Sequence, residues 1–279
     1  MINMRTDYLD SLTNTDFDRS EAQQFRGKCR TGEHSGPTTG FCMKFVQANL
    51  VILPKSYAYD FLLFCQRNPK PCPLLEVTEQ GSYTPSILAP SADLRTDLPK
   101  YNILQSGTIT DQVPNISEYW SEDLVSFLLG CSFSFEEALL SAKIPVRQIE
   151  ENKNVPMYAT SIPCRDSGVF RNSKLVVSMR PIPVEMVNDA INVTARFPTV
   201  HGSPVQIGKP EEIGIEDINK VDYGESVTIN EGEIPIFWAC GVTPMKAIID
   251  ANLPFAITHA PGHMFITDKL NSELNIFSI

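Results

Sequence analysis

Short apolar runs alternate with amphipathic stretches along most of the chain, and this pattern predicts an α/β fold. Apolar runs bounded by Gly, Pro or polar residues are typical of buried strands, whereas apolar positions at helical spacing predict helices. We expect strands at residues 47–54, 74–77, 102–105, 124–129, 157–162, 175–179, 205–208, 234–239, 254–258 and 264–267. We expect helices at residues 16–26, 55–67, 135–142, 184–197 and 243–252.

The texture of the chain changes between residues 141 and 215, where strand-like segments surround the Pro-rich run SMRPIP. We interpret residues 141–215 as a smaller α+β domain inserted into a main mixed-sheet α/β domain, which is formed by residues 1–140 and 216–279. The sequence shows no evident internal repeat and no low-complexity tract.

A net charge of -10 over 279 residues argues against a nucleic acid or an anionic membrane as partner. No apolar run approaches the roughly 18 residues of a transmembrane helix, and the first residues do not resemble a signal peptide. Seven cysteines without a paired C-x-x-C motif predict reduced thiols in a cytoplasmic protein. Homo-oligomer formation stays open.

The densest reactive chemistry lies between residues 234 and 268. Cys240 stands between a predicted strand and a predicted helix, where a helix dipole would stabilise a thiolate, although free cysteines are mostly buried and inert. His259 and His263 share the loop HAPGH, whose Pro and Gly prevent a regular helix and therefore a zinc-type pair on one helix face. We favour acid–base catalysis for one of these histidines over metal ligation, with structural hydrogen bonding as the alternative. Asp268 either orients an imidazole or caps a turn.

Polar residues at predicted element ends add further candidates. Ser134 and Glu137 have the spacing of a capping box, so Cys131 and Ser132 would offer backbone N–H groups and a hydroxyl for an oxyanion, or would simply cap the helix. Thr243 is expected to be the N-cap of its own helix. His201 fits a turn, or a loop that closes over the site. Asn49 is a polar residue in an apolar strand and needs partners.

Ten sequence blocks, in order along nearly the whole chain, resemble the D-glutamate cyclase-like family, whose members are often labelled hydro-lyases. The blocks are QANLVILP, NPKPCPLLEV, RTDLP, GCSFSFEEAL, IPVRQIE, NVPMYATSIPC, VVSMRP, FPTVHGSPV, FWACGVTP and THAPGHMFITD. The resemblance implies a two-part α/β fold and dehydrating cyclisation of D-glutamate to 5-oxo-D-proline. This chain departs from the family pattern at residues 41–44, where an Ala-Pro-Gly turn is usual, and at Met245, where Gln is expected.

This reaction would need a carboxylate clamp, for which a guanidinium is suited. Arg95, Arg147 and Arg180 lie in three of the family blocks, and each either contacts substrate or forms a structural salt bridge, Asp97 being the expected partner of Arg95. No dinucleotide, P-loop, G-x-S-x-G or zinc-ligand motif is present, so we expect no cofactor and no metal. The expected partner is a small acidic substrate. The alternatives are a hydro-lyase acting on another small hydroxy or amino dicarboxylic acid, and a non-catalytic protein that binds a small acid.

Overall fold

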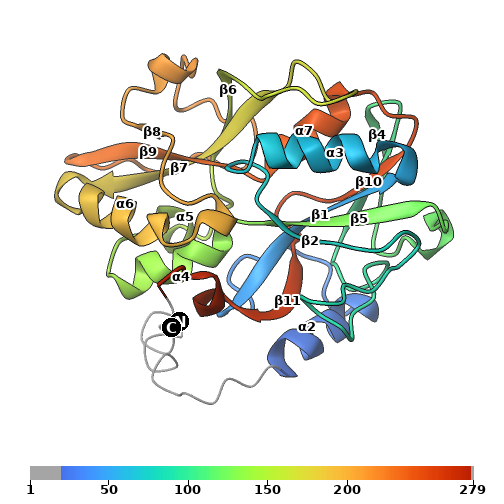
Figure 1. The fold of residues 1–279 in the computed structure, drawn as a ribbon. Coiled ribbons are helices and arrows are strands. Elements are labelled where there is room, and N and C mark those ends of the chain that lie inside the picture. The colour runs from blue at the N-terminus through green and yellow to red at the C-terminus, as the bar shows by residue number, and fades with distance from the viewer. Residues whose placement is uncertain (1–19, 278–279) are drawn as a thin grey trace.

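The computed structural model describes residues 20–277, which form two β-sheets flanked by helices (Figure 1). The two-part α/β architecture expected from the sequence is confirmed. Every strand pairing is antiparallel. Among the described residues, no helix combines the length and the apolar character needed to span a membrane.

The strands are β1 (Phe45–Pro54), β2 (Leu74–Val77), β3 (Tyr101–Gln105), β4 (Thr108–Val113), β5 (Leu124–Gly130), β6 (Met157–Pro163), β7 (Lys174–Pro183), β8 (Gln206–Ile207), β9 (Glu233–Ala239), β10 (Ala256–His259) and β11 (Phe265–Leu270). The α-helices are α2 (Ser20–Arg30), α3 (Lys55–Arg67), α4 (Phe133–Ser141), α5 (Arg147–Glu150), α6 (Val187–Ala195) and α7 (Val242–Asp250). Short 3-10 turns are η1 (Ser117–Tyr119), η2 (Val184–Met186), η3 (Pro198–Val200), η4 (Pro210–Ile213) and η5 (Asn271–Leu274).

The larger sheet has the order β2-β5-β1-β10-β3-β4, and β11 also pairs with β1. Strand β1 is central because its side chains pack into two hydrophobic cores, one on each face of the sheet. Leu50 and Ile52 pack against the loop that contains Leu94, whereas Val51 and Leu53 pack against the helices on the other face. Burial on both faces explains the uninterrupted apolar run of this strand at residues 50–53.

One edge of β1 changes neighbour part-way along the strand. Its first half pairs with β11, through Gln47 and Ile266, and its second half pairs with β10, through Val51 and Thr258. Strands β10 and β11 therefore separate beside residues 49 and 50, and we call this place the fork.

The smaller sheet has the order β6-β7-β9-β8. Strand β9 belongs to this sheet, although the expected domain limits place residues 216–279 in the main domain. The second sheet thus draws its strands from residues 157–239, beyond the 141–215 segment that we interpret as the inserted domain.

The two sheets contain the same strand ladder. Strand β1 pairs with β5 from Ala48 opposite Gly130 to Pro54 opposite Leu124. Strand β7 pairs with β9 in the same way, from Val177 opposite Ala239 to Pro183 opposite Glu233. In each case the first strand ends in a proline followed by a helical segment, and the second runs through a cysteine into a nine-residue helix.

Equivalent hydrogen bonds occur in both halves. The backbone N–H of Gln47 donates to the Ser134 hydroxyl at 3.2 Å, and that of Val176 donates to the Thr243 hydroxyl at 3.0 Å. Residues 176 and 243 occupy the places in the second ladder that residues 47 and 134 occupy in the first.

The last strands of the two halves, β6 and β11, also form equivalent hydrogen bonds. The Thr160 hydroxyl of β6 donates to the Leu175 carbonyl, and the Thr267 hydroxyl of β11 donates to the Val46 carbonyl. The agreement of registers and hydrogen bonds indicates two copies of one structural unit, a repeat that is not evident in the sequence itself.

The two copies are intertwined: near the C-terminus of the chain, β11 lies beside β1 and α7 beside α3 (Figure 1). The first copy consists of β1, α3, β2, β5, α4 and β6, and the second of β7, α6, β8, β9, α7 and β11. Each copy gives its last strand to the other sheet, since β6 pairs with β7 and β11 pairs with β1. The preceding helices are exchanged too: α4 packs beside α6, and α7 shares a core with α3. This exchange brings the starts of α4 and α7 into the interior of the molecule.

Candidate functional site

A buried polar cluster surrounds residues 49 and 50 of β1, at the fork. The Asn49 amide donates to the carbonyl of Gly130, at the end of β5, over 2.8 Å. Asn49 also lies directly against Gly241, because a methyl group at residue 241 would overlap the Asn49 amide. Asn49 therefore joins the end of β5 to the start of α7.

His259 fills the gap in the sheet at the fork. Its Nδ1 is 3.2 Å from the backbone nitrogen of Leu50 and 3.3 Å from the Leu50 carbonyl oxygen. We assign Nδ1 as the acceptor of the Leu50 N–H, since a buried backbone donor without an acceptor is costly. Burial lowers the pKa of His259 to about 4, so the ring is neutral at pH 7 and carries its proton on Nε2.

His263 lies beside His259, and its charge would lower the pKa of His259 further. The His263 ring is half-buried, and its Nδ1 is 3.0 Å from the carbonyl oxygen of Pro261. A carbonyl only accepts, so Nδ1 carries the proton and Nε2 holds the lone pair. Burial lowers the pKa of His263, and the nearby Lys100 adds to this.

Cys131 and Cys240 occupy equivalent turns, each between a strand end and a helix start. Both are nearly buried, with 7% of their surface exposed. Burial raises the pKa of the Cys131 thiol to about 12 and that of the Cys240 thiol to about 11. The helix start lowers each value by a backbone N–H bond to the sulfur, but burial outweighs it. Both cysteines are therefore thiols, not thiolates, at neutral pH.

The start of α4 differs from the expected capping box. The helix begins at Phe133, and its N-cap residue Ser132 forms no side-chain cap bond. The Ser134 hydroxyl instead accepts from β1, as described above, and the backbone N–H groups of Ser134 and Phe135 bond to the carbonyls of Cys131 and Ser132. The N–H groups of Ser134 and Phe135 are thus not available to an oxyanion.

Arg180 forms the charged part of the cluster and has no exposed surface. It donates to the Ser178 hydroxyl at 3.1 Å, to the Ser132 hydroxyl at 3.1 Å, and to the Glu136 carboxylate in a buried ion pair. The Gln148 amide donates to the same carboxylate at 2.7 Å. The guanidinium is fully buried and bonds to Glu136 and to the two serine hydroxyls, so a polar group nearby would meet it through those hydroxyls.

His201 lies close enough to Arg180 for the guanidinium charge to lower the pKa of its ring. Its Nδ1 bonds to the Lys70 carbonyl oxygen at 2.8 Å, and burial, the main cause, lowers its pKa to about 4. The other ring nitrogen, Nε2, is buried without a partner. The residue is in a turn, as expected, with the left-handed backbone angle φ of 85°.

Two of the expected site residues have structural roles. Thr243 lies inside α7 rather than at its N-cap, which is Gly241, and its hydroxyl links the helix to Val176 of β7. Arg147 forms ion pairs with Glu150 and Glu233 at the surface of the second sheet.

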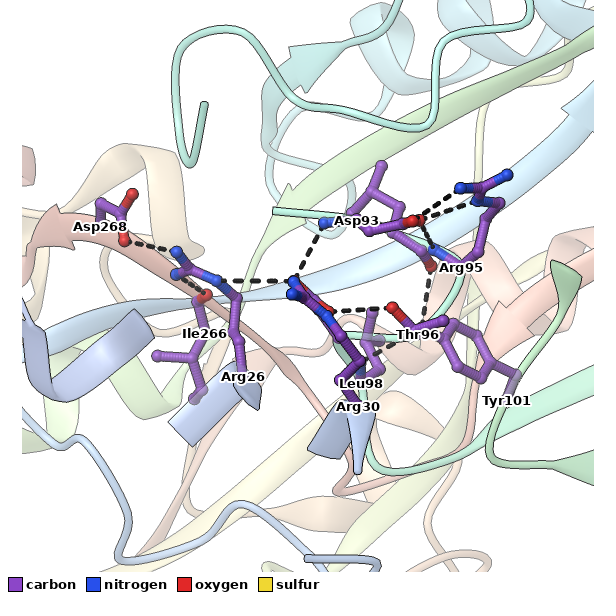
Figure 2. A network of polar contacts seen from close by, with 11 residues as sticks. Arg26, Arg30, Asp93, Arg95, Thr96, Leu98, Tyr101, Ile266 and Asp268 are labelled. Atoms are coloured by element: carbon purple, nitrogen blue, oxygen red, sulfur yellow. Dashed lines mark hydrogen bonds and ion pairs between the residues drawn. The ribbon is translucent and has the colours of Figure 1, made fainter. Parts of the chain in front are cut away.

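Arg95 and Asp268 belong to a separate ionic network that ties α2 to the larger sheet (Figure 2). Arg95 pairs with Asp93, not with the expected Asp97, and stacks on Tyr83. Asp268 pairs with the buried Arg26 at 2.8 Å and so orients neither imidazole. Asp97 is instead bound by Arg30, through two bonds of 2.8 and 2.7 Å.

The cluster therefore unites seven of the expected residues: Asn49, Cys131, Ser132, Arg180, His201, Cys240 and His259, with His263 beside them. Across residues 20–277, no three His, Cys, Asp or Glu side chains are grouped as the ligands of a metal ion would be.

Comparison with known proteins decides the family. The D-glutamate cyclase family profile matches residues 125–268. A protein named "Putative hydro-lyase" from Natranaerobius thermophilus is 58% identical over 250 residues, which cover 90% of this chain and 95% of that protein. The chain belongs to the D-glutamate cyclase family.

A second relative in this family is "Putative hydro-lyase RBAM_004300" from Bacillus velezensis. It is 54% identical, over 91% of this chain and 96% of the relative. The crystal structure of a nitrogen repressor-like protein, MJ0159 from Methanococcus jannaschii, aligns with 84% of this chain and 90% of that chain. Its sequence identity is 10% and its TM-score 0.38, too low to support an argument about fold or function.

The sequence analysis missed three members of the cluster: Ser178, Glu136 and Gln148. Ser178 could have been found, because a residue two positions before Arg180 in a strand projects from the same face. Glu136 was missed because the capping-box pattern selects its neighbour, Glu137. Nothing in the sequence indicates Gln148, because its link to Glu136 depends on how α5 packs.

Proposed function

We propose that this chain is a hydro-lyase that converts D-glutamate to 5-oxo-D-proline and water. Its membership in the D-glutamate cyclase family supports the reaction class. The observation that carries the proposal is the pair of neutral imidazoles at the fork, His259 and His263, which hold their protons on opposite ring nitrogens.

The reaction forms a bond between the α-nitrogen and the carboxyl carbon of the γ-carboxylate and breaks one carbon–oxygen bond of that carboxylate. The ammonium group loses two protons, and the departing oxygen leaves with them as water, so the net charge of substrate and product is the same. The site must take two protons from the nitrogen and deliver two to the oxygen, and acid–base groups of this kind contribute about 10²–10⁴-fold each.

The two histidines can divide these tasks. Nε2 of His263 holds a lone pair and would accept a proton from the ammonium group. His259, protonated once the substrate carboxylate lies beside it, would donate its Nε2 proton to the departing oxygen. The neutral His259 would then take the second proton of the nitrogen, and His263 would deliver the first to the oxygen, which leaves as water with both rings restored. The low pKa of His259 makes it a strong acid once protonated, and a substrate carboxylate beside it would raise that pKa toward the working range.

The position of Asn49 supports the placement of the γ-carboxylate at the fork. Its amide nitrogen is 2.8 Å from the Gly130 carbonyl and lies against Gly241, so the side chain cannot rotate freely. A fixed amide beside the reacting carbon stabilises developing charge better than a mobile one.

An isotope experiment tests this proposal. D-glutamate labelled with ¹⁸O in its γ-carboxylate should give 5-oxo-D-proline that retains one labelled oxygen, with the other appearing in water. The His263→Ala variant should lose most of the activity through kcat, while a Cys240→Ala variant should keep activity because the thiol is protonated. Full activity in the His259→Ala, His263→Ala double variant would disprove these roles.

A second candidate is dehydration of another small hydroxy or amino dicarboxylic acid. Met245 supports it, because this apolar side chain is packed with Cys240 where the family pattern has Gln. A substrate screen that follows water loss from hydroxy dicarboxylic acids would distinguish the two, since only the second candidate predicts turnover there.

A further inference from the structure

The duplicated fold provides two equivalent turns at the centre of the molecule, but only one of them carries charge. In the turn before α4, Ser132 faces Ser178 across the Arg180 guanidinium. In the turn before α7, the equivalent residues are Gly241 and Asn49, which pack directly on each other.

The charged pair itself has no counterpart in the other half. By the equivalence of the ladders, Val51 occupies the place of Arg180, and Met245 occupies the place of Glu136. One copy of the unit has thus acquired a buried ion pair at a position where the other copy is apolar. A buried ion pair is seldom retained for stability alone, because apolar replacements are often as stable.

Arg180 fixes the direction in which the Ser132 hydroxyl points. The hydroxyl oxygen accepts a bond from the guanidinium at 3.1 Å, so its own proton must point away from Arg180. Ser132 is the N-cap residue of α4, yet its side chain makes no cap bond. Among the residues that the structure describes, no acceptor is bonded to this proton, although the side chain is nearly fully buried.

Two further buried atoms near Arg180 have no partner. One is Nε2 of His201, whose ring lies close enough to Arg180 for the guanidinium charge to lower the pKa of the ring. The other is Oε1 of Gln148, whose amide nitrogen bonds to the Glu136 carboxylate. Both atoms are acceptors, because Nδ1 of His201 donates to the Lys70 carbonyl and Oε1 of Gln148 is an amide oxygen. Buried polar atoms without partners are rare and call for an explanation, and a ligand with a donor group, such as the ammonium group next to the α-carboxylate of an amino acid, would supply one.

We infer that the Ser132 hydroxyl binds a carboxylate of the substrate, and that Arg180 is a positioning residue that acts through it. Glu136 and Gln148 hold Arg180 from behind, and Ser132 presents a donor polarised by the guanidinium. The carboxylate bound here is the one that does not react, since the reacting end lies at the fork with Asn49 and His259. This assignment of the substrate's two ends rests on the proposed function; the carboxylate contact itself does not.

The test compares Ser132→Ala with Ser134→Ala. These serines are two residues apart at the start of one helix, but Ser134 is bonded to the backbone of β1. Losing a hydrogen bond to a charged group raises KM by about ten- to hundred-fold, so Ser132→Ala should raise KM for D-glutamate to that extent, with kcat nearly unchanged. Its Tm should fall, because the substitution also leaves a buried N–H group of Arg180 without its acceptor. Ser134→Ala should lower Tm and leave KM unchanged.

A double variant separates positioning from direct contact. Arg180→Lys should also raise KM, and adding it to Ser132→Ala should raise KM no further, because Arg180 acts only through the hydroxyl. An unchanged KM in Ser132→Ala, or independent effects of the two substitutions, would overturn the inference.

Binding of glutarate, an unreactive dicarboxylate, keeps the inference apart from the proposed reaction. If the wild-type protein does not convert D-glutamate but binds glutarate, and Ser132→Ala weakens that binding about ten-fold or more, the carboxylate contact stands and the proposed function fails. If D-glutamate is converted equally well by Ser132→Ala, the proposed function stands and the contact is wrong. A folded wild-type protein that neither binds glutarate nor converts D-glutamate would contradict both.

Discussion

Two buried histidines make the stability of this protein depend on pH in a range where carboxylates contribute little. His201 and His259 each have a pKa lowered by burial from 6.5 to about 4. In the unfolded chain both rings return to the ordinary value, so between about pH 4 and pH 6.5 the unfolded state binds more protons. The free energy of unfolding must therefore fall as the pH falls through this window.

The size of the effect follows from the two pKa values. At pH 5 each ring is mostly protonated in the unfolded chain and mostly neutral in the folded one, a difference of about 2 kcal/mol per ring relative to pH 7. The two rings together cost about 4 kcal/mol, a large part of the 5–15 kcal/mol of a typical domain. The lowered pKa of His263 acts in the same direction.

Urea denaturation followed by circular dichroism at about pH 7, 6 and 5 measures this loss. His201→Asn removes one ring and keeps a residue that tolerates the left-handed backbone at this turn. The variant should be less stable at pH 7, because it loses packing, but its further loss on going to pH 5 should be about 2 kcal/mol smaller than that of the wild type. Above about pH 7.5 the two proteins should show the same pH dependence. An identical loss between pH 7 and pH 5 in both proteins would refute the assignment of a buried, neutral His201.

Three further predictions follow from the turns and the helices. Cys240, with its pKa of about 11, should react with iodoacetamide far more slowly at pH 7.5 than a free thiol, and a rate near that of a free thiol would show that its pKa is not raised. Gly130→Ala should lower stability by about 1–3 kcal/mol, since its methyl group would overlap a backbone carbonyl; Gly27→Ala, in open space within α2, should raise stability by about 0.5–1 kcal/mol in the same thermal denaturation experiment. Ser134→Ala and Thr243→Val remove equivalent hydrogen bonds and should each cost about 1 kcal/mol, so a large effect of only one would argue against the equivalence of the two halves.

The elements of this fold are readable from the sequence because their signals are local. Helix α3 has the expected bounds, and the apolar runs give nearly all strands to within a few residues. Strand β4 was missed because its side chains are exposed, although Ser106 and Gly107 before it have the positive φ angles of a tight hairpin turn. The helix expected at residues 16–26 lies partly outside the described residues, and its described part continues to Arg30.

The duplication is not evident in the sequence because the copies share a hydrogen-bond pattern rather than residue identities. The hairpin of β3 and β4 interrupts the first copy, and a long loop between β8 and β9 interrupts the second. Only the strand registers, which depend on tertiary structure, reveal that Ser134 corresponds to Thr243.

The partners of charged residues were the least predictable part of the site. Asp268 binds Arg26, and Arg95 binds Asp93 although Asp97 is equally close in sequence. Such choices depend on which elements pack together, and no spacing rule contains that information. Arg180 was a candidate because it lies in one of the family blocks, but its bonds to the serine hydroxyls could be seen only in three dimensions.

Proton NMR of the purified protein with D-glutamate and with L-glutamate, in separate tubes, tests the central claim most directly. Cyclisation shifts the α and γ protons, and the account predicts their conversion to the 5-oxoproline pattern with the D-enantiomer only. A folded protein that leaves D-glutamate unchanged would contradict the proposed reaction and would direct the search to another small acid.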